Sequence, residues 1–296
     1  AFDMFRFTTK WQPQDSIKFV YPKTSITDFF PKIAGYDRVF GNFSAENAVY
    51  FHLPSVEGYD PLYIKRYGEF IAGIDTTGQS GLTQAVVLLP RESENTSKAI
   101  NLLGIKYFLQ KKKDNHKNWT FPIWNYPKDQ FKLIFSDSQY EVFENTYAFP
   151  RAFLVGSYKV IQNQNGIISA MFAKGTDLRD SIILEKDPHV PAGFLPSGTV
   201  KIASYTPDKI TINVSTNVPQ LLFLSDAYYP GWKAYVDGKV TEIYRADYAF
   251  RAVKVPAGKH MIIFSYQPQS FFLGLLLAAF GVIGMLGALW YHKEKA

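Results

Sequence analysis

The sequence predicts an α+β protein, with a mixed α/β N-terminal domain, an all-β sandwich or jelly-roll domain and one C-terminal transmembrane helix. Three observations carry this prediction. Helical and strand-like apolar patterns mix over the first two thirds of the chain, short alternating runs separated by turn residues fill residues 198–268, and Phe271–Tyr291 is apolar without interruption. A helix as long as this last stretch spans about 30 Å, the thickness of a bilayer hydrocarbon core.

The stretch Phe271–Tyr291 is expected to cross a membrane. Trp290 and Tyr291 stand at its end, where amphipathic rings favour the membrane interface. The alternative is a buried helix of a soluble domain, but such helices usually keep a polar edge and this one has none. Residues 292–296, with two lysines, are then a cytoplasmic tail, and the bulk of the chain is extracytoplasmic.

Composition limits the class of protein. The 296 residues are 47% hydrophobic and 20% charged, which predicts folded domains rather than disorder. The aromatic content of 17% favours β-rich packing and leaves rings for surfaces that meet sugars, lipid headgroups or protein. A net charge of +6 fits attraction to anionic lipid, and no nucleic-acid-binding signature accompanies it. The absence of cysteine excludes disulfides, cysteine-ligated metals and cysteine catalysis.

Residues 1–32 are predicted to be a juxtamembrane entry segment, in which aromatic side chains alternate with Arg6 and Lys10. These rings either pack against the next domain or form an interfacial belt after a preceding membrane helix. No signal peptide precedes the sequence, so we expect the C-terminal piece of a longer membrane protein. The expected partners are therefore membrane lipid and the N-terminal transmembrane helices of the same protein.

Residues 33–197 are predicted to form the mixed α/β domain. Including one helix in the entry segment, helices are expected at 24–28, 63–71, 97–103 and 167–173. Strands are expected at 36–40, 48–53, 105–109, 131–136, 139–145, 148–158 and 181–185, with loop segments as the alternative for the first two and an extended piece for the last. The basic run 111–117 is expected to be a solvated loop, and the Pro- and Gly-rich segment 187–197 a linker.

Residues 198–268 are predicted to form the β-sandwich domain, because turn signals recur between short apolar runs. The strongest hairpin signal is Asp237-Gly238, since a type I′ turn needs positive φ at both central residues. Strands are expected at 199–204, 209–215, 220–225, 231–236, 239–244, 249–255 and 259–266.

A search for catalytic motifs returns little. The five histidines show no metal-ligand spacing, and no nucleophile elbow, Walker loop or dinucleotide fingerprint occurs, so no metal site is expected. Asp60, Asp75 and Asp226 are carboxylates beside glycine or aromatic residues, and a structural role in turns is the default interpretation.

The most distinctive surface candidate is Ser225–Gly238 (SDAYYPGWKAYVDG), which contains three Tyr, one Trp and a Pro-Gly pair. Aromatic rings with polar neighbours suit the apolar faces and hydroxyls of a sugar. The alternative is that Trp232 and Tyr235 fill the sandwich core while Pro230-Gly231 makes a corner. A following hairpin carries Arg245, Asp247, Tyr248, Phe250 and Arg251, which form either a polar patch or charge pairs within the hairpin.

Several of these segments resemble the YfhO family of bacterial membrane proteins. The most specific is DAYYPGWKAYVDG, and the others follow the order that the family shows. The segments that carry the resemblance are Asp226–Gly238, Tyr244–Val253 and Val255–His260, with Arg38–Gly41, Gly58–Leu62, Leu102–Tyr107 and Pro150–Ala152 upstream.

The resemblance implies a polytopic, GT-C-like glycosyltransferase that takes sugar from a polyprenyl-phosphate carrier outside the membrane and acts on cell-envelope polymers. In such enzymes the catalytic acid lies in an early external loop, so no catalytic residue is carried over to this chain. By itself the chain is expected to be inactive and to need no cofactor, the polyprenyl-phosphate sugar being the donor of the parent.

The predicted function is the extracytoplasmic C-terminal part of such an enzyme, shaping the acceptor side. The alternative is a non-catalytic, membrane-anchored module that binds carbohydrate or an envelope polymer. A glycan or envelope polymer is the expected ligand. The candidate substrate-binding residues are Tyr59, Asp60, Asp226, Tyr228, Tyr229, Trp232, Arg245 and Arg251.

Overall fold

The computed structural model describes residues 2–11, 16, 19, 21–41, 45–56, 58–59, 62–75, 86–87, 89–113 and 120–295. It has two compact units: unit 1 contains residues 1–63 and 71–151, and unit 2 contains residues 64–70 and 152–296. The α+β class is confirmed, because helices and several sheets share the chain. The predicted domain boundaries between residues 32 and 33 and between residues 197 and 198 remain predictions.

Unit 1 is built on a four-stranded sheet of order β1-β4-β6-β5, in which β1 and β4 are parallel and the other pairs antiparallel. Its strands are β1 (Arg38–Phe40), β4 (Ile105–Lys111), β5 (Phe131–Ser136) and β6 (Tyr140–Asn145), with β2 (Gly58–Tyr59) and β3 (Val86–Val87) paired separately. Its helices are α1 (Phe2–Trp11), α3 (Ser25–Ile33), α4 (Ala45–Tyr50), α6 (Thr96–Leu102) and the 3₁₀ turn η1 (Ile123–Asn125). Helix α5 (Lys65–Ile74) begins in unit 2 and ends in unit 1.

The sheet of unit 1 is covered on both faces. Helix α3 starts at a capping box on Thr24 and packs Ile26 and Phe30 against Val39 and Leu109. The neighbouring strand positions point to the other face, where Phe40 and Phe108 surround Phe121, with ring centroids 5.4 Å and 4.6 Å from its own. The predicted hairpin 131–145 and the helices at 24–28, 63–71 and 97–103 are confirmed.

Unit 2 contains a sandwich of two sheets, as the predicted fold class requires, although three of its strands lie at residues 152–184, before the segment predicted to form it. One sheet has the order β10-β11-β17-β13-β14 and the other the order β7-β12-β16-β15-β9-β8. The strands are β7 (Ala152–Val155), β8 (Ser157–Val160), β9 (Ser181–Leu184), β10 (Thr199–Tyr205), β11 (Lys209–Thr216), β12 (Gln220–Leu224), β13 (Trp232–Val236), β14 (Lys239–Thr241), β15 (Tyr244–Ala246), β16 (Phe250–Val255) and β17 (Gly258–Tyr266), with helix α7 (Gln164–Phe172).

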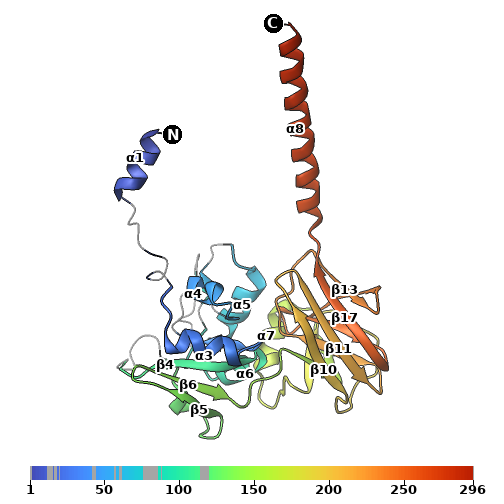
Figure 1. The fold of residues 1–296 in the computed structure, drawn as a ribbon. Coiled ribbons are helices and arrows are strands. Elements are labelled where there is room, and N and C mark those ends of the chain that lie inside the picture. The colour runs from blue at the N-terminus through green and yellow to red at the C-terminus, as the bar shows by residue number, and fades with distance from the viewer. Residues whose placement is uncertain are drawn as a thin grey trace. The chain divides into compact units, whose positions relative to one another are not determined.

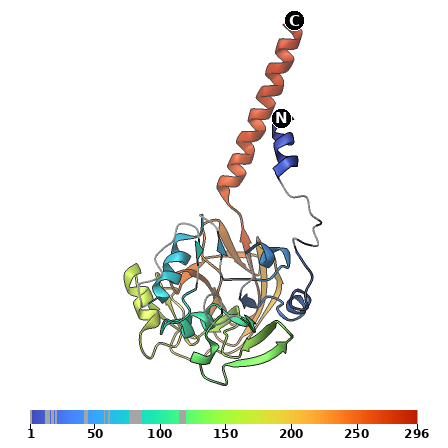
Figure 2. The same cartoon turned by 90° about the vertical axis from the view of Figure 1, so that its left-hand side faces the viewer.

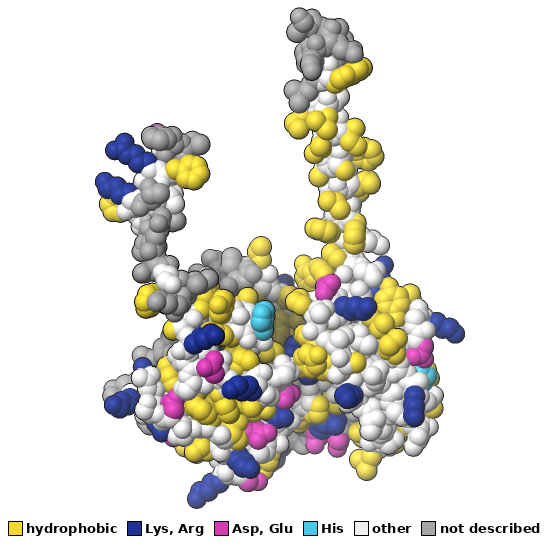
Figure 3. Space-filling model, viewed as in Figure 1, with side chains coloured by type: hydrophobic (Ala, Val, Ile, Leu, Met, Phe, Trp, Pro, Cys, Tyr) yellow, Lys and Arg dark blue, Asp and Glu magenta, His cyan; other side chains and the backbone are white. Residues whose placement is uncertain are grey.

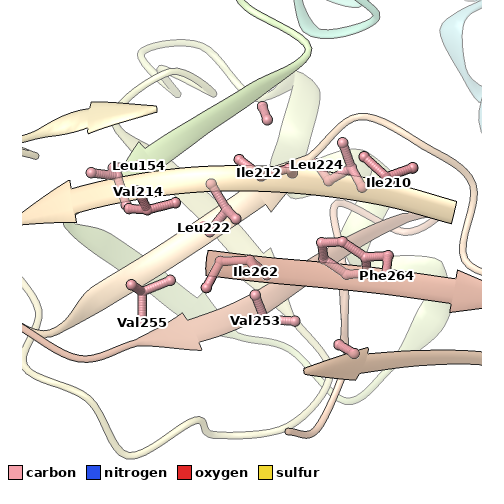
Figure 4. Packing of buried hydrophobic residues seen from close by; sticks show 12 residues of the cluster. Leu154, Ile210, Ile212, Val214, Leu222, Leu224, Val253, Val255, Ile262 and Phe264 are labelled. Carbon is pink, nitrogen blue, oxygen red and sulfur yellow. The ribbon is translucent and has the colours of Figure 1, made fainter. Parts of the chain in front are cut away.

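The sandwich core lies between the two sheets. Ile212 and Val214 of β11 and Ile262 of β17 meet Leu222 of β12 and Val253 of β16, all at most 3% exposed (Figure 4). The six-stranded sheet is buried on its other face too, where Phe250 packs against Phe70 at a ring-centroid distance of 5.1 Å. This explains why β12 reads as a continuous apolar run instead of an alternating one.

Three expected strands are different in the structure. Residues 48–53 fall in helix α4 and the turn after it, where the amide of Phe51 donates to the carbonyl of Asn47. The strand expected at 148–158 divides into β7 and β8 at Gly156, where a Cβ would lie 2.1 Å from the Phe194 carbonyl oxygen. The strand expected at 239–244 divides into β14 and β15, because the chain leaves one sheet for the other. Part of the basic run 111–117 lies outside the described residues.

Helix α8 (Gln269–Lys295) is one continuous helix that follows β17 directly (Figures 1 and 2). Its segment Gln269–Gly287 is the one helix, among the described residues, that is long and apolar enough to cross a membrane. Apolar side chains cover the visible face of this segment (Figure 3), and none of it is buried. This supports the predicted membrane helix over the alternative of a buried core helix, because a core helix would have its apolar surface covered by other parts of the protein.

Candidate functional site

The candidate residues of unit 2, together with their neighbours, form three groups, of which the first is a buried ion pair. Asp226 follows β12 and Arg251 lies on β16, and their side chains are 6% and 3% exposed. An Arg251 guanidinium nitrogen is 3.2 Å from Asp226 Oδ2, which also accepts a hydrogen bond of 2.9 Å from the Tyr205 hydroxyl. The guanidinium lies 4.1 Å from the ring centroid of Trp232, so the indole stacks on the arginine of the pair.

The second group is a partly exposed network of charged and tyrosine side chains that we call the polar cluster: Arg66, Glu69, Glu185, Arg245, Tyr228 and Tyr248. Glu185 accepts from Arg66 through Oε1 and from Arg245 through Oε2, the latter at 3.1 Å. The guanidinium of Arg245 stacks 4.4 Å above the ring centroid of Tyr228. Because Glu185 joins Arg66 to Arg245, and Glu69 accepts from the Tyr248 hydroxyl, the cluster holds the β15–β16 hairpin against the start of α5.

The tip of that hairpin has unusual backbone. Asp247 and Tyr248 have φ of 43° and 69°, values that side chains with a Cβ rarely adopt. Asp247 both donates its amide to the Ile183 carbonyl and accepts the Ile183 amide at Oδ1, each at 2.8 Å. The Tyr248 hydroxyl donates to Glu69 at 2.7 Å. These bonds fix a conformation that costs on the order of 1–3 kcal/mol per strained residue.

Two groups at this tip have shifted proton affinities. Complete burial raises the pKa of the Asp247 carboxyl to about 7, against the effect of the Ile183 amide. Burial, reinforced by the hydrogen bond to Glu69, raises the pKa of the Tyr248 hydroxyl to about 12. Oδ2 of Asp247 is buried without a hydrogen-bond partner. Protonation of this carboxyl would therefore remove the cost of burying an unpaired negative charge.

The third group forms a pocket of about 410 Å³ where β17 passes into α8, which we call the root pocket. It is lined by Tyr229, Pro230, Gly231, Trp232, Lys233, Tyr266, Gln267, Pro268, Gln269 and Ser270. The ring of Tyr266 lies 5.5 Å from that of Trp232 and 6.3 Å from that of Tyr229, between ring centroids. Trp232 is therefore shared, with the buried pair on one side and the pocket on the other.

The structure thus separates the predicted site residues instead of uniting them. Asp226 and Arg251 are buried, Tyr228 and Arg245 belong to the polar cluster, and Tyr229 and Trp232 line the root pocket. Tyr59 lies on β2 in unit 1, and Asp60 lies outside the described residues. Sequence reasoning missed Arg66, Glu69 and Glu185, because nothing in their local sequence marks them as partners of the distant β15–β16 hairpin.

Chemically, these groups are suited to binding and to structural support. Among the described residues, no three His, Cys, Asp or Glu side chains are placed to hold a metal ion. In the polar cluster Glu185 pairs with Arg66 and Arg245, and Glu69 accepts from Tyr248. The root pocket has no carboxylate in its lining. The exposed ring of Tyr229, the lysine and the amides of the root pocket are the groups most available to a ligand.

Comparison with known proteins agrees with the motifs. Residues 195–278 match the family of "Bacterial membrane protein YfhO", a region that covers most of the sandwich and the start of α8. A similar curated protein is the "Uncharacterized protein YfhO" of Bacillus subtilis (strain 168), 25% identical over 136 residues. That match covers 45% of this chain and 15% of the relative, so the chain corresponds to a small part of that relative's length. No solved structure matches significantly.

Proposed function

We propose that this chain, a YfhO-family membrane protein, is the extracytoplasmic C-terminal part of a polytopic, glycosyltransferase-like protein. In this proposal the parent transfers sugar from a polyprenyl-phosphate carrier to a cell-envelope polymer. The part described here shapes the acceptor side and contributes no catalytic acid. The reaction class is what the resemblance of the sequence motifs implies. The family match supports a membrane protein, and the apolar helix α8 supports attachment to the membrane.

The observation that carries the proposal is the direct junction between the sandwich and α8. Strand β17 ends at Tyr266 and α8 begins at Gln269, and the amide of Gln267 donates to the Gly231 carbonyl at 2.7 Å. The family-specific loop is thereby tied to the start of the membrane helix. A sugar on a lipid carrier is transferred at the membrane surface, so a domain held there can guide the acceptor.

The test is an insertion of about eight Gly/Ser residues between Pro268 and Gln269 in the full-length parent. Such a linker spans about 15 Å and frees the sandwich from a fixed height. Sugar transfer from polyprenyl-phosphate sugar to envelope polymer is then measured in membranes. The control is the same insertion between Leu195 and Pro196, in a loop where Leu195 is 80% exposed.

We expect the junction insertion to lower transfer to the polymer severalfold and the loop insertion to leave it unchanged. Equal activity of the two variants contradicts the guiding role. A parent that transfers no sugar, yet binds envelope glycans in a pull-down, favours the alternative of a non-catalytic envelope-binding module. The exposed Tyr229 in the root pocket is the observation that favours this alternative, because an exposed ring can stack on a sugar.

A further inference from the structure

The root pocket is defined by its position along the chain. Its lining includes Gln269 and Ser270, the first residues of α8, and the apolar span starts at the same Gln269. When α8 crosses a bilayer, residues at the start of the span lie in the headgroup layer, several ångströms outside the hydrocarbon core. The root pocket therefore opens among lipid headgroups, whichever side of the membrane the sandwich occupies.

The lining has the chemistry of a headgroup site. Lys233 is its single ionisable cation, and no Asp or Glu lines it. Gln267, Gln269 and Ser270 add neutral hydrogen-bonding groups, while Tyr229, Trp232 and Tyr266 supply amphipathic rings that favour the interface. The nearby Arg251 adds no free charge, because Asp226 neutralises it beneath Trp232.

The pocket is also preformed. Gly231 has φ of +100°, and a Cβ at this position would lie 2.9 Å from Cε2 of Tyr266. The close approach lets the Gly231 carbonyl accept the Gln267 amide, which fixes the two sides of the pocket relative to each other. A preformed pocket loses little conformational freedom when a ligand enters.

We propose that the root pocket binds the phosphodiester headgroup of an anionic phospholipid, with Lys233 facing the phosphate and the amide and hydroxyl groups facing headgroup hydroxyls. A neutral sugar is the less suitable occupant, because the carboxylates that usually accept hydrogen bonds from sugar hydroxyls are missing from the lining. This proposal holds independently of sugar transfer by the parent protein.

The experiment measures lipid binding to the full chain in detergent by native mass spectrometry. The probes are phosphatidylglycerol and phosphatidylcholine with identical acyl chains, soluble glycerol 3-phosphate, and a neutral oligosaccharide. The variants are Lys233→Ala, Lys233→Arg and the matched control Lys239→Ala. Both lysines are exposed and lie on adjacent strands, but Lys239 pairs with Val236, at the end of β13 away from α8.

We expect phosphatidylglycerol to bind at least fivefold more tightly than phosphatidylcholine, since one lysine near a lipid surface contributes about 1 kcal/mol. Lys233→Ala should remove most of this preference, whereas Lys233→Arg and Lys239→Ala should keep it. Circular dichroism spectra that match the wild type show that the variants are folded. Tyr229→Ala, which removes a 46%-exposed ring, should weaken both lipids without abolishing the preference.

Three results would overturn the proposal: an unchanged preference in Lys233→Ala, an equal loss in Lys239→Ala, or tighter binding of the oligosaccharide than of phosphatidylglycerol. Glycerol 3-phosphate that binds as tightly as the lipid would show a soluble phosphate site instead. A parent protein that transfers no sugar but keeps the lipid preference would refute the proposed function and leave the lipid site standing.

Discussion

At the scale of single residues, the buried pair of Asp226 and Arg251 is the most informative. Both were candidates for sugar binding, yet their side chains are 6% and 3% exposed, and Trp232 stacks on the arginine. Side chains so deeply buried leave almost no surface for a ligand to contact. Their burial favours the interpretation in which this loop serves the sandwich core, and it leaves Tyr229 as the exposed ring of the motif.

A double-mutant cycle tests this structural role. Asp226→Ala and Arg251→Met should each lower the free energy of unfolding by about 3–5 kcal/mol, because each leaves a buried charge without its partner. The double variant should lose clearly less than the sum. Urea unfolding of the full chain in detergent measures all four corners of the cycle. Additive losses would mean that the two side chains do not act as a pair.

Asp247 gives a prediction about pH. Burial raises its pKa to about 7, so between about pH 4 and pH 7 the folded chain binds a proton that the unfolded chain has released. The stability contribution of this group therefore falls as pH rises, by about 4 kcal/mol across that window. Above pH 7 its contribution stays constant.

The variant Asp247→Asn isolates the effect, because its amide oxygen can still accept the Ile183 amide. Urea unfolding of both proteins at several pH values from 4 to 8 gives the comparison. As pH rises, the free energy of unfolding of the wild type should fall relative to that of the variant. A difference that does not depend on pH would show that this carboxyl is ionised in the folded chain at every pH tested.

How far the sequence could predict the site depends on the distance between partners. Arg245, Asp247 and Tyr248 were recognisable because they crowd one hairpin. Arg66 and Glu185 were not, since the ion pair between them joins segments more than a hundred residues apart in sequence. Only the fold brings them together. The root pocket could be predicted in part. Its aromatic loop is distinctive in the sequence, but Tyr266 and Gln267 come next to that loop only through the pairing of β13 with β17.

At the scale of elements, local signals predicted most strands of the sandwich. Asp237-Gly238 does form the β13–β14 turn, with φ of 50° and 79°. The failures lie where tertiary structure overrides the local pattern. Residues 239–244 alternate like one strand, yet the sandwich needs the chain to change sheets there, so β14 and β15 separate. Helix α4 is short, and its apolar spacing does not distinguish it from a strand.

Two glycines test how tightly the sandwich is built. Both Gly198 and Gly238 have positive φ, but a Cβ at Gly198 would lie 2.2 Å from the Ser215 carbonyl oxygen, whereas Gly238 has open space. Gly238→Ala should cost about 1 kcal/mol of strain, and Gly198→Ala about 1–3 kcal/mol more, because β10 must move from β11. Thermal unfolding of both variants gives the comparison. Equal losses of stability in the two variants would show that the backbone before β10 can move to accommodate a Cβ at Gly198 without strain.

At the scale of the whole molecule, the main feature is the exposed apolar surface of α8. From Phe271 to Leu286, and again at Trp290, its large apolar side chains are 52–64% exposed. Such a surface is unfavourable in water and favourable in lipid. The composition of this helix was sufficient to predict it, because length and unbroken apolarity need no tertiary information. The side of the membrane is a harder inference, since large domains cross membranes largely regardless of charge.

The proposed orientation places the sandwich outside the cell and the tail of α8 inside. The chain contains no cysteine, so single cysteines report on one position each. Val240→Cys replaces a side chain that is 75% exposed on β14, and Lys295→Cys marks the tail. In intact cells a membrane-impermeant maleimide should label Val240→Cys and should label Lys295→Cys only after lysis. The cysteine-free protein is the blank. The reverse pattern would place the sandwich in the cytoplasm and would remove the basis for action on an external envelope polymer, because the acceptor would then lie across the membrane.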